Sequence, residues 1–135
     1  MTSKWDEHQI GERVTAILAE AAGEMEGHHF GAPFLSAYQL AIEFAHRHPE
    51  AFAALDMPLG GAGTGEHNSL ARYLPNQLSR RIKSGQITNI EGAFLSNWDV
   101  SEIVFDYDGQ EVRSSLIGPL VNTSMFRMRT DGATE

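Results

Sequence analysis

Hydrophobic positions recur at helical spacing through the first two thirds of the chain and alternate with polar positions in the last third. Residues 5–25 place their apolar side chains on one stripe, which predicts an amphipathic helix. Residues 37–47 follow a capping box formed by Ser36 and Gln39, and their apolar character on most sides predicts a buried helix. A proline at the first position predicts a short helix over residues 49–55.

A third long helix is predicted by apolar residues that recur every four positions over residues 70–82. Asn68 or Ser69 is expected to cap its start, and Gly85 is expected to end it. Pro75 falls inside this pattern and lacks a backbone donor, so it predicts a kink or a split into two pieces.

Short strands are predicted beyond the third helix, with a hairpin turn at Asp108 and Gly109. The strand candidates are residues 86–90, 93–96, 102–107, 110–117 and 122–129. The predicted fold is one α+β domain over residues 1–135. About three N-terminal helices and one short helix (1–85) pack on a small, mostly antiparallel sheet (86–129), and residues 130–135 form a disordered tail.

The hairpin register follows from the two-residue turn. It pairs Phe105 with Val112 and sets Asp106 opposite Glu111. Like charges directly opposite each other are unfavourable, so a slipped register or a longer turn stays open as an alternative. The predicted apolar sheet face holds Ile103, Phe105, Val112 and Phe126.

Composition narrows the possible chemistry. The chain has 135 residues, a formal net charge of −8 and no cysteine. The lack of cysteine excludes disulfides, thiolate nucleophiles and Cys-ligated metal sites. The N-terminal residues have no apolar signal region, and no uncharged stretch is long enough to cross a bilayer. We therefore expect a cytoplasmic protein that has no membrane partner.

Charge is distributed unevenly along the chain. Residues 67–90 hold four basic side chains and no acidic one, namely Arg72, Arg80, Arg81 and Lys83. One interpretation is that the acidic face of the first helix neutralises them. The alternatives are that they contact phosphates or bind an acidic protein partner.

The order of three helices and a hairpin is also that of a winged helix, so a DNA-binding regulator that uses the basic helix at 68–83 is one alternative. Two features oppose it. About twenty residues separate the second helix from the third, where a helix-turn-helix has three or four, and the predicted wing is acidic.

Histidines suggest another alternative, a metal-dependent enzyme. Glu43 and His46 form an E-x-x-H motif on the second helix, which places both side chains on one face. The neighbouring His28 and His29 would complete a set of two histidines and one carboxylate if the fold brought them close.

The favoured interpretation is a non-enzymatic interaction or regulatory protein that acts through protein–protein contacts. It assigns no catalytic residue and no cofactor, because the sequence contains no recognisable set of catalytic residues. Trp98 is the candidate interface residue, since large aromatic side chains in loops often anchor interfaces. The expected partner is another protein or a second copy of the chain, most simply in a twofold dimer.

Overall fold

The computed structural model describes residues 3–61, 69–114 and 122–129. The predicted tail at 130–135 lies outside these residues. The helices are α1 (Lys4–Glu7), α2 (Ile10–Gly23), α3 (Ala37–Arg47), α4 (Pro49–Leu55) and α5 (Leu70–Ser84). The strands are β1 (Leu35–Ser36), β2 (Ile90–Leu95), β3 (Val104–Tyr107), β4 (Gln110–Arg113) and β5 (Thr123–Met128). None of the described helices is both long enough and apolar enough to span a membrane.

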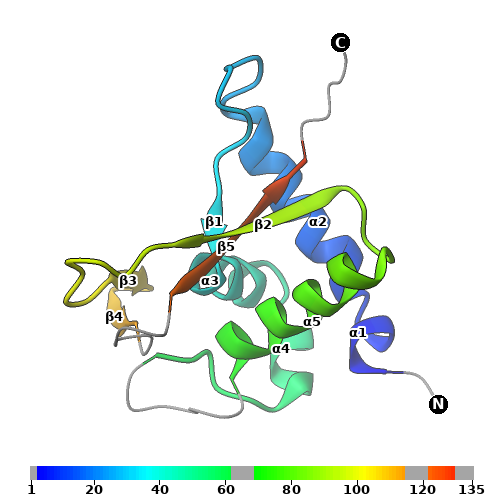
Figure 1. The fold of residues 1–135 in the computed structure, drawn as a ribbon. Helices are drawn as coiled ribbons and strands as arrows, with labels where there is room; N and C mark the ends of the chain where they lie inside the picture. The colour runs from blue at the N-terminus through cyan, green and yellow to red at the C-terminus, as the bar shows by residue number, and fades with distance from the viewer. Residues whose placement is uncertain (1–2, 62–68, 115–121, 130–135) are drawn as a thin grey trace.

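The predicted α+β class is confirmed, with helices in the N-terminal part and an antiparallel sheet completed by C-terminal strands (Figure 1). The strand order is β1-β5-β2, so β5 is central and β2 forms one edge. Phe126 on β5 pairs with Leu35 on one side and with Gly92 on the other. In place of the two strands predicted at 86–90 and 93–96, the structure has one strand, β2, which begins at Ile90 and ends at Leu95, so residues 86–89 are not in a strand. β1 was not predicted from the sequence, because a strand of two residues shows no alternation of apolar and polar positions.

The hairpin forms a separate two-stranded sheet. The predicted single apolar sheet face is therefore wrong, since Phe105 and Val112 belong to the hairpin and Phe126 belongs to the three-stranded sheet. The predicted register itself is confirmed, with Phe105 opposite Val112.

The turn explains why this register tolerates opposed carboxylates. Asp108 and Gly109 have φ values of 55° and 86°, as a type I′ turn requires. Asp106 Oδ1 accepts a hydrogen bond of 3.1 Å from the Gly109 N–H, and Glu111 lies 2.6 Å from the Arg113 guanidinium. Each carboxylate thus has its own partner, so the hairpin does not slip.

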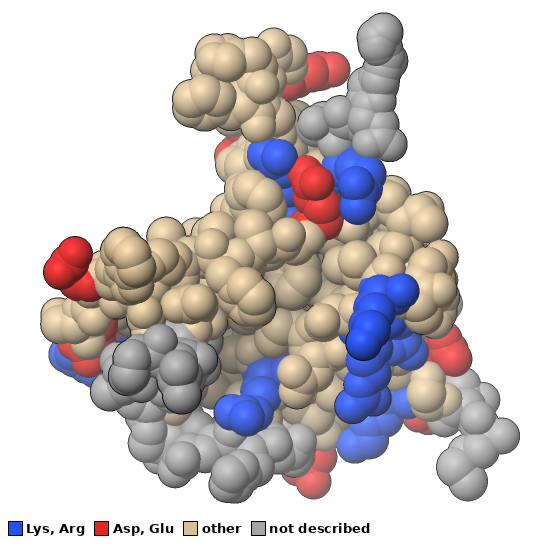
Figure 2. Space-filling model, viewed as in Figure 1, with Lys and Arg blue, Asp and Glu red and all other residues tan. Residues whose placement is uncertain are grey.

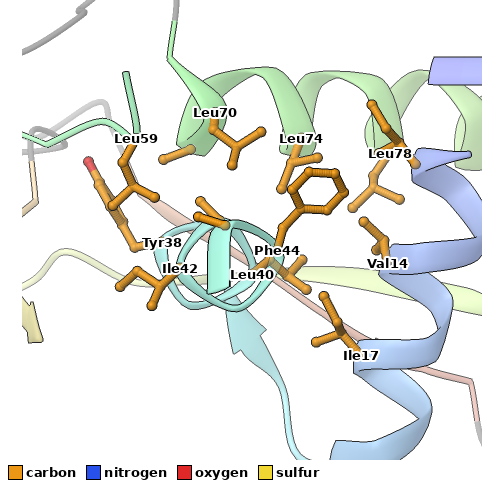
Figure 3. Close-up of a cluster of buried hydrophobic side chains, with 14 of the residues drawn as sticks. Val14, Ile17, Tyr38, Leu40, Ile42, Phe44, Leu59, Leu70, Leu74 and Leu78 are labelled. Atoms are coloured by element: carbon orange, nitrogen blue, oxygen red, sulfur yellow. The ribbon is translucent and has the colours of Figure 1, made fainter. Parts of the chain in front are cut away.

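The hydrophobic core lies where α2, α3 and α5 meet the sheet. Figure 3 shows their apolar side chains pointing toward one another around Phe44, which is fully buried. The largest fully buried side chains also include Ile10, Val14, Ile17, Leu18, Leu40, Leu55, Leu70, Leu74, Leu78 and Ile90. Burying each such side chain stabilises the fold by about 1.5–3 kcal/mol relative to exposing it.

The first predicted helix is broken into α1 and α2. Gln9 lies between them with a φ of 52°, a left-handed conformation that ends the α1 turn. The break turns Trp5 into the core, where it is 5% exposed. Gly11 allows this approach, because a Cβ there would lie 3.0 Å from Trp5 Nε1. Periodicity over residues 5–25 could not predict a break that depends on this packing.

The predicted start of α3 is confirmed by its capping box. The Gln39 N–H donates to Ser36 Oγ at 3.1 Å, and the Ser36 N–H donates to Gln39 Oε1 at 2.7 Å. Each bond satisfies a backbone donor that the helix leaves free at its start.

Helix α5 runs without a split through Pro75 and ends at Gly85, which has a φ of 84°. Backbone carbonyls satisfy its first donors, since Leu70 and Ala71 donate to Pro58 and Leu59 at 2.9 Å each. Because these donors are already paired, they are not available to bind an anion.

Candidate interaction surface

Helix α5 has an apolar face against the core and a polar face toward solvent. Leu70, Leu74 and Leu78 are fully buried and are spaced four residues apart. The opposite stripe, exposed to solvent, consists of Arg72, Asn76, Ser79, Arg80 and Lys83. We name these five residues the α5 stripe. Figure 2 shows Lys and Arg side chains along this helix on the face toward the viewer.

Three of the four predicted basic residues, Arg72, Arg80 and Lys83, belong to the α5 stripe. None of the three forms an ion pair with any acidic residue in the described parts of the chain. Free cations on a helix surface can meet phosphates or carboxylates without first breaking an existing pair. The neutralisation by the first helix that the sequence suggested is not seen among the described residues.

Arg81, the fourth basic residue, is placed differently. Its guanidinium lies over the Trp5 ring, 4.4 Å from the ring centroid, and donates a hydrogen bond to the Gln77 side chain. Its Nε atom is buried without a hydrogen-bond partner in the structure. Arg81 therefore links α5 to α1 and does not extend into solvent with the α5 stripe.

Acidic residues on α2 and α3 pair with Arg47 and not with the cations of α5. Glu20 on α2 lies 2.5 Å from Arg47 on α3, and Glu43 lies 3.0 Å from it. Hydrogen bonding to Glu20 is the main effect that raises the pKa of Arg47 above its usual value. These two carboxylates, with Glu24 and Asp106, line a cleft of about 540 Å³ around Arg47. Sequence patterns could not predict this cleft, because it depends on how α2, α3 and the hairpin pack together.

A groove of about 370 Å³ separates α5 from the three-stranded sheet. Pro75, Asn76, Ser79 and Ile82 line it from α5, and Gly92, Ala93, Phe94, Ser124 and Phe126 line it from β2 and β5. The α5 stripe therefore borders this groove, since Asn76 and Ser79 belong to both.

Apolar side chains remain exposed at the far end of β2 and beyond it. Phe94 is 71% exposed, Leu95 is 44% exposed and Trp98 is 83% exposed. Trp98 lies in a short loop held by hydrogen bonds: its own N–H donates to Ser96 Oγ at 3.1 Å, and the Asn97 N–H donates to Asn122 Oδ1 at 3.1 Å. An exposed indole on a loop whose backbone is held in this way is suited to contact a partner.

The structure does not bring the candidate metal ligands together. His28 and His29 stack on each other in the loop after α2, with 4.4 Å between ring centroids. Glu43 pairs with Arg47, and His46 Nε2 lies 2.8 Å from Asp108 Oδ1 on the hairpin. Within the described residues, no group of three or more potential ligands has the geometry to hold a metal ion.

The hairpin packs against α3. Phe105 stacks on Tyr38 with 5.3 Å between ring centroids, and Tyr107 lies against His46 at 5.2 Å. The hairpin carboxylates therefore border α3, while the cations of the stripe belong to α5.

Comparison of the chain with protein-family models, curated proteins and solved structures returned no match.

Proposed function

We propose that the protein is a non-catalytic regulator that binds duplex DNA through the α5 stripe. The observation that carries this proposal is that Arg72, Arg80 and Lys83 lie exposed on one face of α5, without an acidic partner among the described residues. Phosphate contacts by Arg and Lys dominate the affinity of proteins for DNA.

The connectivity supports the same proposal. Apart from α1, the short α4 between α3 and α5, and the β3–β4 hairpin between β2 and β5, the described elements follow the order α2, β1, α3, α5, β2 and β5, and the short β1 pairs with the last strand. Winged-helix domains have this order, and their third helix is the one that enters the major groove. Because one fold can serve many functions, the connectivity only adds weight to the exposed cations.

The α5 stripe also carries groups that can read bases. Asn76 and Ser79 lie among the three cations, and amide and hydroxyl side chains bond base edges in the major groove. Arg and Lys would position the helix on phosphates, and Asn76 would contribute sequence preference. This division of roles is typical of helices that read DNA.

The acidic charge of the whole chain restricts the face by which DNA could approach. A net charge of −8 repels a polyanion at long range. Four carboxylates line the cleft at α2, α3 and the hairpin, whereas α5 has no acidic residue. DNA would therefore approach only by α5. The β3–β4 hairpin, which lies on α3, would make no phosphate contact in this proposal. In this proposal the protein meets its DNA in the cytoplasm.

The test is binding to a fluorescent mixed-sequence duplex in low salt. We expect micromolar binding, and we expect Arg72→Gln with Arg80→Gln to weaken it about tenfold or more. Arg113→Gln with Arg129→Gln is the matched control, because it removes the same charge from the hairpin and the end of β5. No binding at high micromolar protein, or an equal loss in the control, would overturn the proposal.

The favoured hypothesis from the sequence, protein–protein contact, is the second candidate function. The exposure of Phe94, Leu95 and Trp98 favours it, since exposed apolar clusters mark interaction sites. Trp98→Ala should weaken self-association or partner capture if this cluster is the interface. Sedimentation of the purified chain tests the homodimer directly, and a monomer at high micromolar concentration would exclude it.

A further inference from the structure

We propose that the outer edge of β2 binds an extended acidic peptide segment of a partner protein as an added strand, seated over the groove between β2 and α5. This inference goes beyond DNA binding and predicts a second ligand for the same face of the molecule. Addition of a strand to an exposed sheet edge is a common mode of peptide recognition.

The outer edge of β2 has backbone groups available for pairing. β2 pairs with β5 on one side, and no described strand lies on its other side. The Arg129 N–H donates to the Asn89 carbonyl at 2.9 Å. This bond shows which residues of β2 are hydrogen-bonded to β5 and which are not. Because antiparallel bonding alternates along a strand, the N–H and C=O groups of Ile90, Gly92 and Phe94 point away from β5.

The edge lacks the features that usually prevent pairing. Natural edge strands are protected by lysine, proline, bulges or inward-pointing charges. β2 has the sequence Ile-Glu-Gly-Ala-Phe-Leu, and its register with β5 runs through all six residues without a bulge. Its only charged side chain, Glu91, is held by Arg127 at 2.6 Å. A strand without these protections is suited to take a further strand.

The groove beside the edge provides space for the side chains of the added strand. It has a volume of about 370 Å³, and its floor includes Phe126 and Ile82. Gly92 keeps it open, because a Cβ at this position would lie 3.2 Å from the Phe126 ring. Small apolar side chains of the added strand would fill this space.

Charge complementarity identifies the occupant as acidic. Asn76 and Ser79 of the α5 stripe line the groove. The three cations of the same stripe, Arg72, Arg80 and Lys83, are exposed on this face of α5 and have no acidic partner among the described residues. A second copy of the chain fits poorly. Twofold pairing of two β2 edges would place both α5 stripes on the same side of the joined sheet, where like charges repel. Carboxylates on a separate extended segment would meet these cations instead.

The exposed aromatic residues would form one end of the site. Phe94 lies one residue before the end of β2 and is 71% exposed, and its backbone N–H and C=O groups point away from β5. Trp98 follows in the next loop. An apolar side chain of the partner that extends beyond the groove would contact both rings.

The experiment uses a fluorescent peptide of about eight residues, with valine and glutamate in alternating pairs so that both faces carry both types. We expect micromolar binding and slowed amide exchange at Gly92 and Phe94. A peptide with lysine in place of glutamate should bind at least about tenfold more weakly. Equal binding of the two peptides would overturn the charge assignment.

Two N-methylated peptides test strand addition without altering the protein. In an added strand, every second amide points toward β2 and the others point away from it. Methyl groups on the amides that point toward β2 should reduce affinity about tenfold or more, and methyl groups on the others should change it less than about threefold. If both sets behave alike, or if no peptide binds at millimolar concentration, the proposal is wrong. A Gly92→Val variant should also lose binding, and its folding is checked by circular dichroism.

The duplex assay separates this inference from the proposed function. Duplex binding without peptide binding would overturn the inference and leave the proposed function standing. Peptide binding without duplex binding would support the inference and overturn the proposed function. If both ligands bind, they should compete, because both use Arg72, Arg80 and Lys83. Simultaneous binding without competition would contradict the placement of the peptide along α5.

Discussion

The guanidinium of Arg81 lies over the indole of Trp5, with 4.4 Å between Arg81 Cζ and the ring centroid. This contact joins the first helical turn of the chain to α5. It also distinguishes Arg81 from Arg80, its neighbour in sequence, which extends into solvent. Two adjacent arginines therefore have different roles, one in stability and one on the surface.

The two tryptophans should differ sharply in their contribution to stability. Trp5→Ala removes a core side chain that is 5% exposed and leaves Arg81 without its ring, so we expect a loss of about 3–5 kcal/mol in unfolding free energy. Trp98→Ala removes a side chain that is 83% exposed and should change this free energy by less than about 0.5 kcal/mol. Urea unfolding of both variants measures the difference. Similar losses would show that Trp5 is not a core residue.

Two glycines in open space should respond in opposite directions to alanine. Gly109 has a φ of 86° in the hairpin turn, so Gly109→Ala should destabilise the protein by about 1 kcal/mol through backbone strain. Gly23 ends α2, and Gly23→Ala should stabilise the protein by about 0.5 kcal/mol because alanine favours the helix. A Cβ at either position meets nothing within 4 Å. Thermal unfolding measures whether each variant is more or less stable than the wild type. A stabilised Gly109→Ala variant would contradict the type I′ turn.

The capping box makes a prediction about α3. Ser36→Ala removes the acceptor of the Gln39 N–H and should cost about 1 kcal/mol. Ser69→Ala is the control, because Ser69 precedes α5 without a side-chain capping bond. Equal losses in urea unfolding would mean that the side-chain bond at Ser36 adds nothing to stability.

Local signals in the sequence predicted local structure well. Ser36 and Gln39 identified the start of α3, and the Asp108-Gly109 pair identified the hairpin with its register, because caps and turns depend on residues a few positions apart. The break at Gln9 and the strand β1 were missed. Both depend on contacts distant in sequence, Trp5 with Arg81 and Leu35 with Phe126.

The same distinction applies to the candidate site. Charge counting identified Arg72, Arg80, Arg81 and Lys83 as a group, but it could not show that Arg81 turns toward Trp5. The groove beside Gly92 depends on how α5 meets the sheet. A single sequence has no signal for that placement.

His48 predicts a dependence of stability on pH. Burial is the main effect that lowers its pKa below 6.5, and the nearby Arg13 and Arg47 lower it further. The folded state therefore favours the neutral ring. This contribution is fully present above pH 6.5 and is lost as the pH falls through the lower pKa of the folded state.

The measurement is urea unfolding at pH 7.5 and pH 5.5. The wild-type protein should lose more stability between these pH values than His48→Gln does. His29→Gln, in the exposed loop after α2, should behave as the wild type. If His48→Gln shows the same loss as the wild type, His48 does not contribute to the pH dependence.

Salt dependence tests how many cations of the α5 stripe contact phosphates. If Arg72, Arg80 and Lys83 each neutralise one phosphate, the logarithm of the duplex binding constant should fall with the logarithm of salt concentration at a slope of roughly −3. Lys83→Gln should reduce that slope by about 0.9 on every duplex sequence, because a phosphate contact carries no base preference. Asn76→Ala should leave the slope unchanged and reduce the preference among sequences. An unchanged slope in Lys83→Gln would show that DNA approaches by a face other than the α5 stripe.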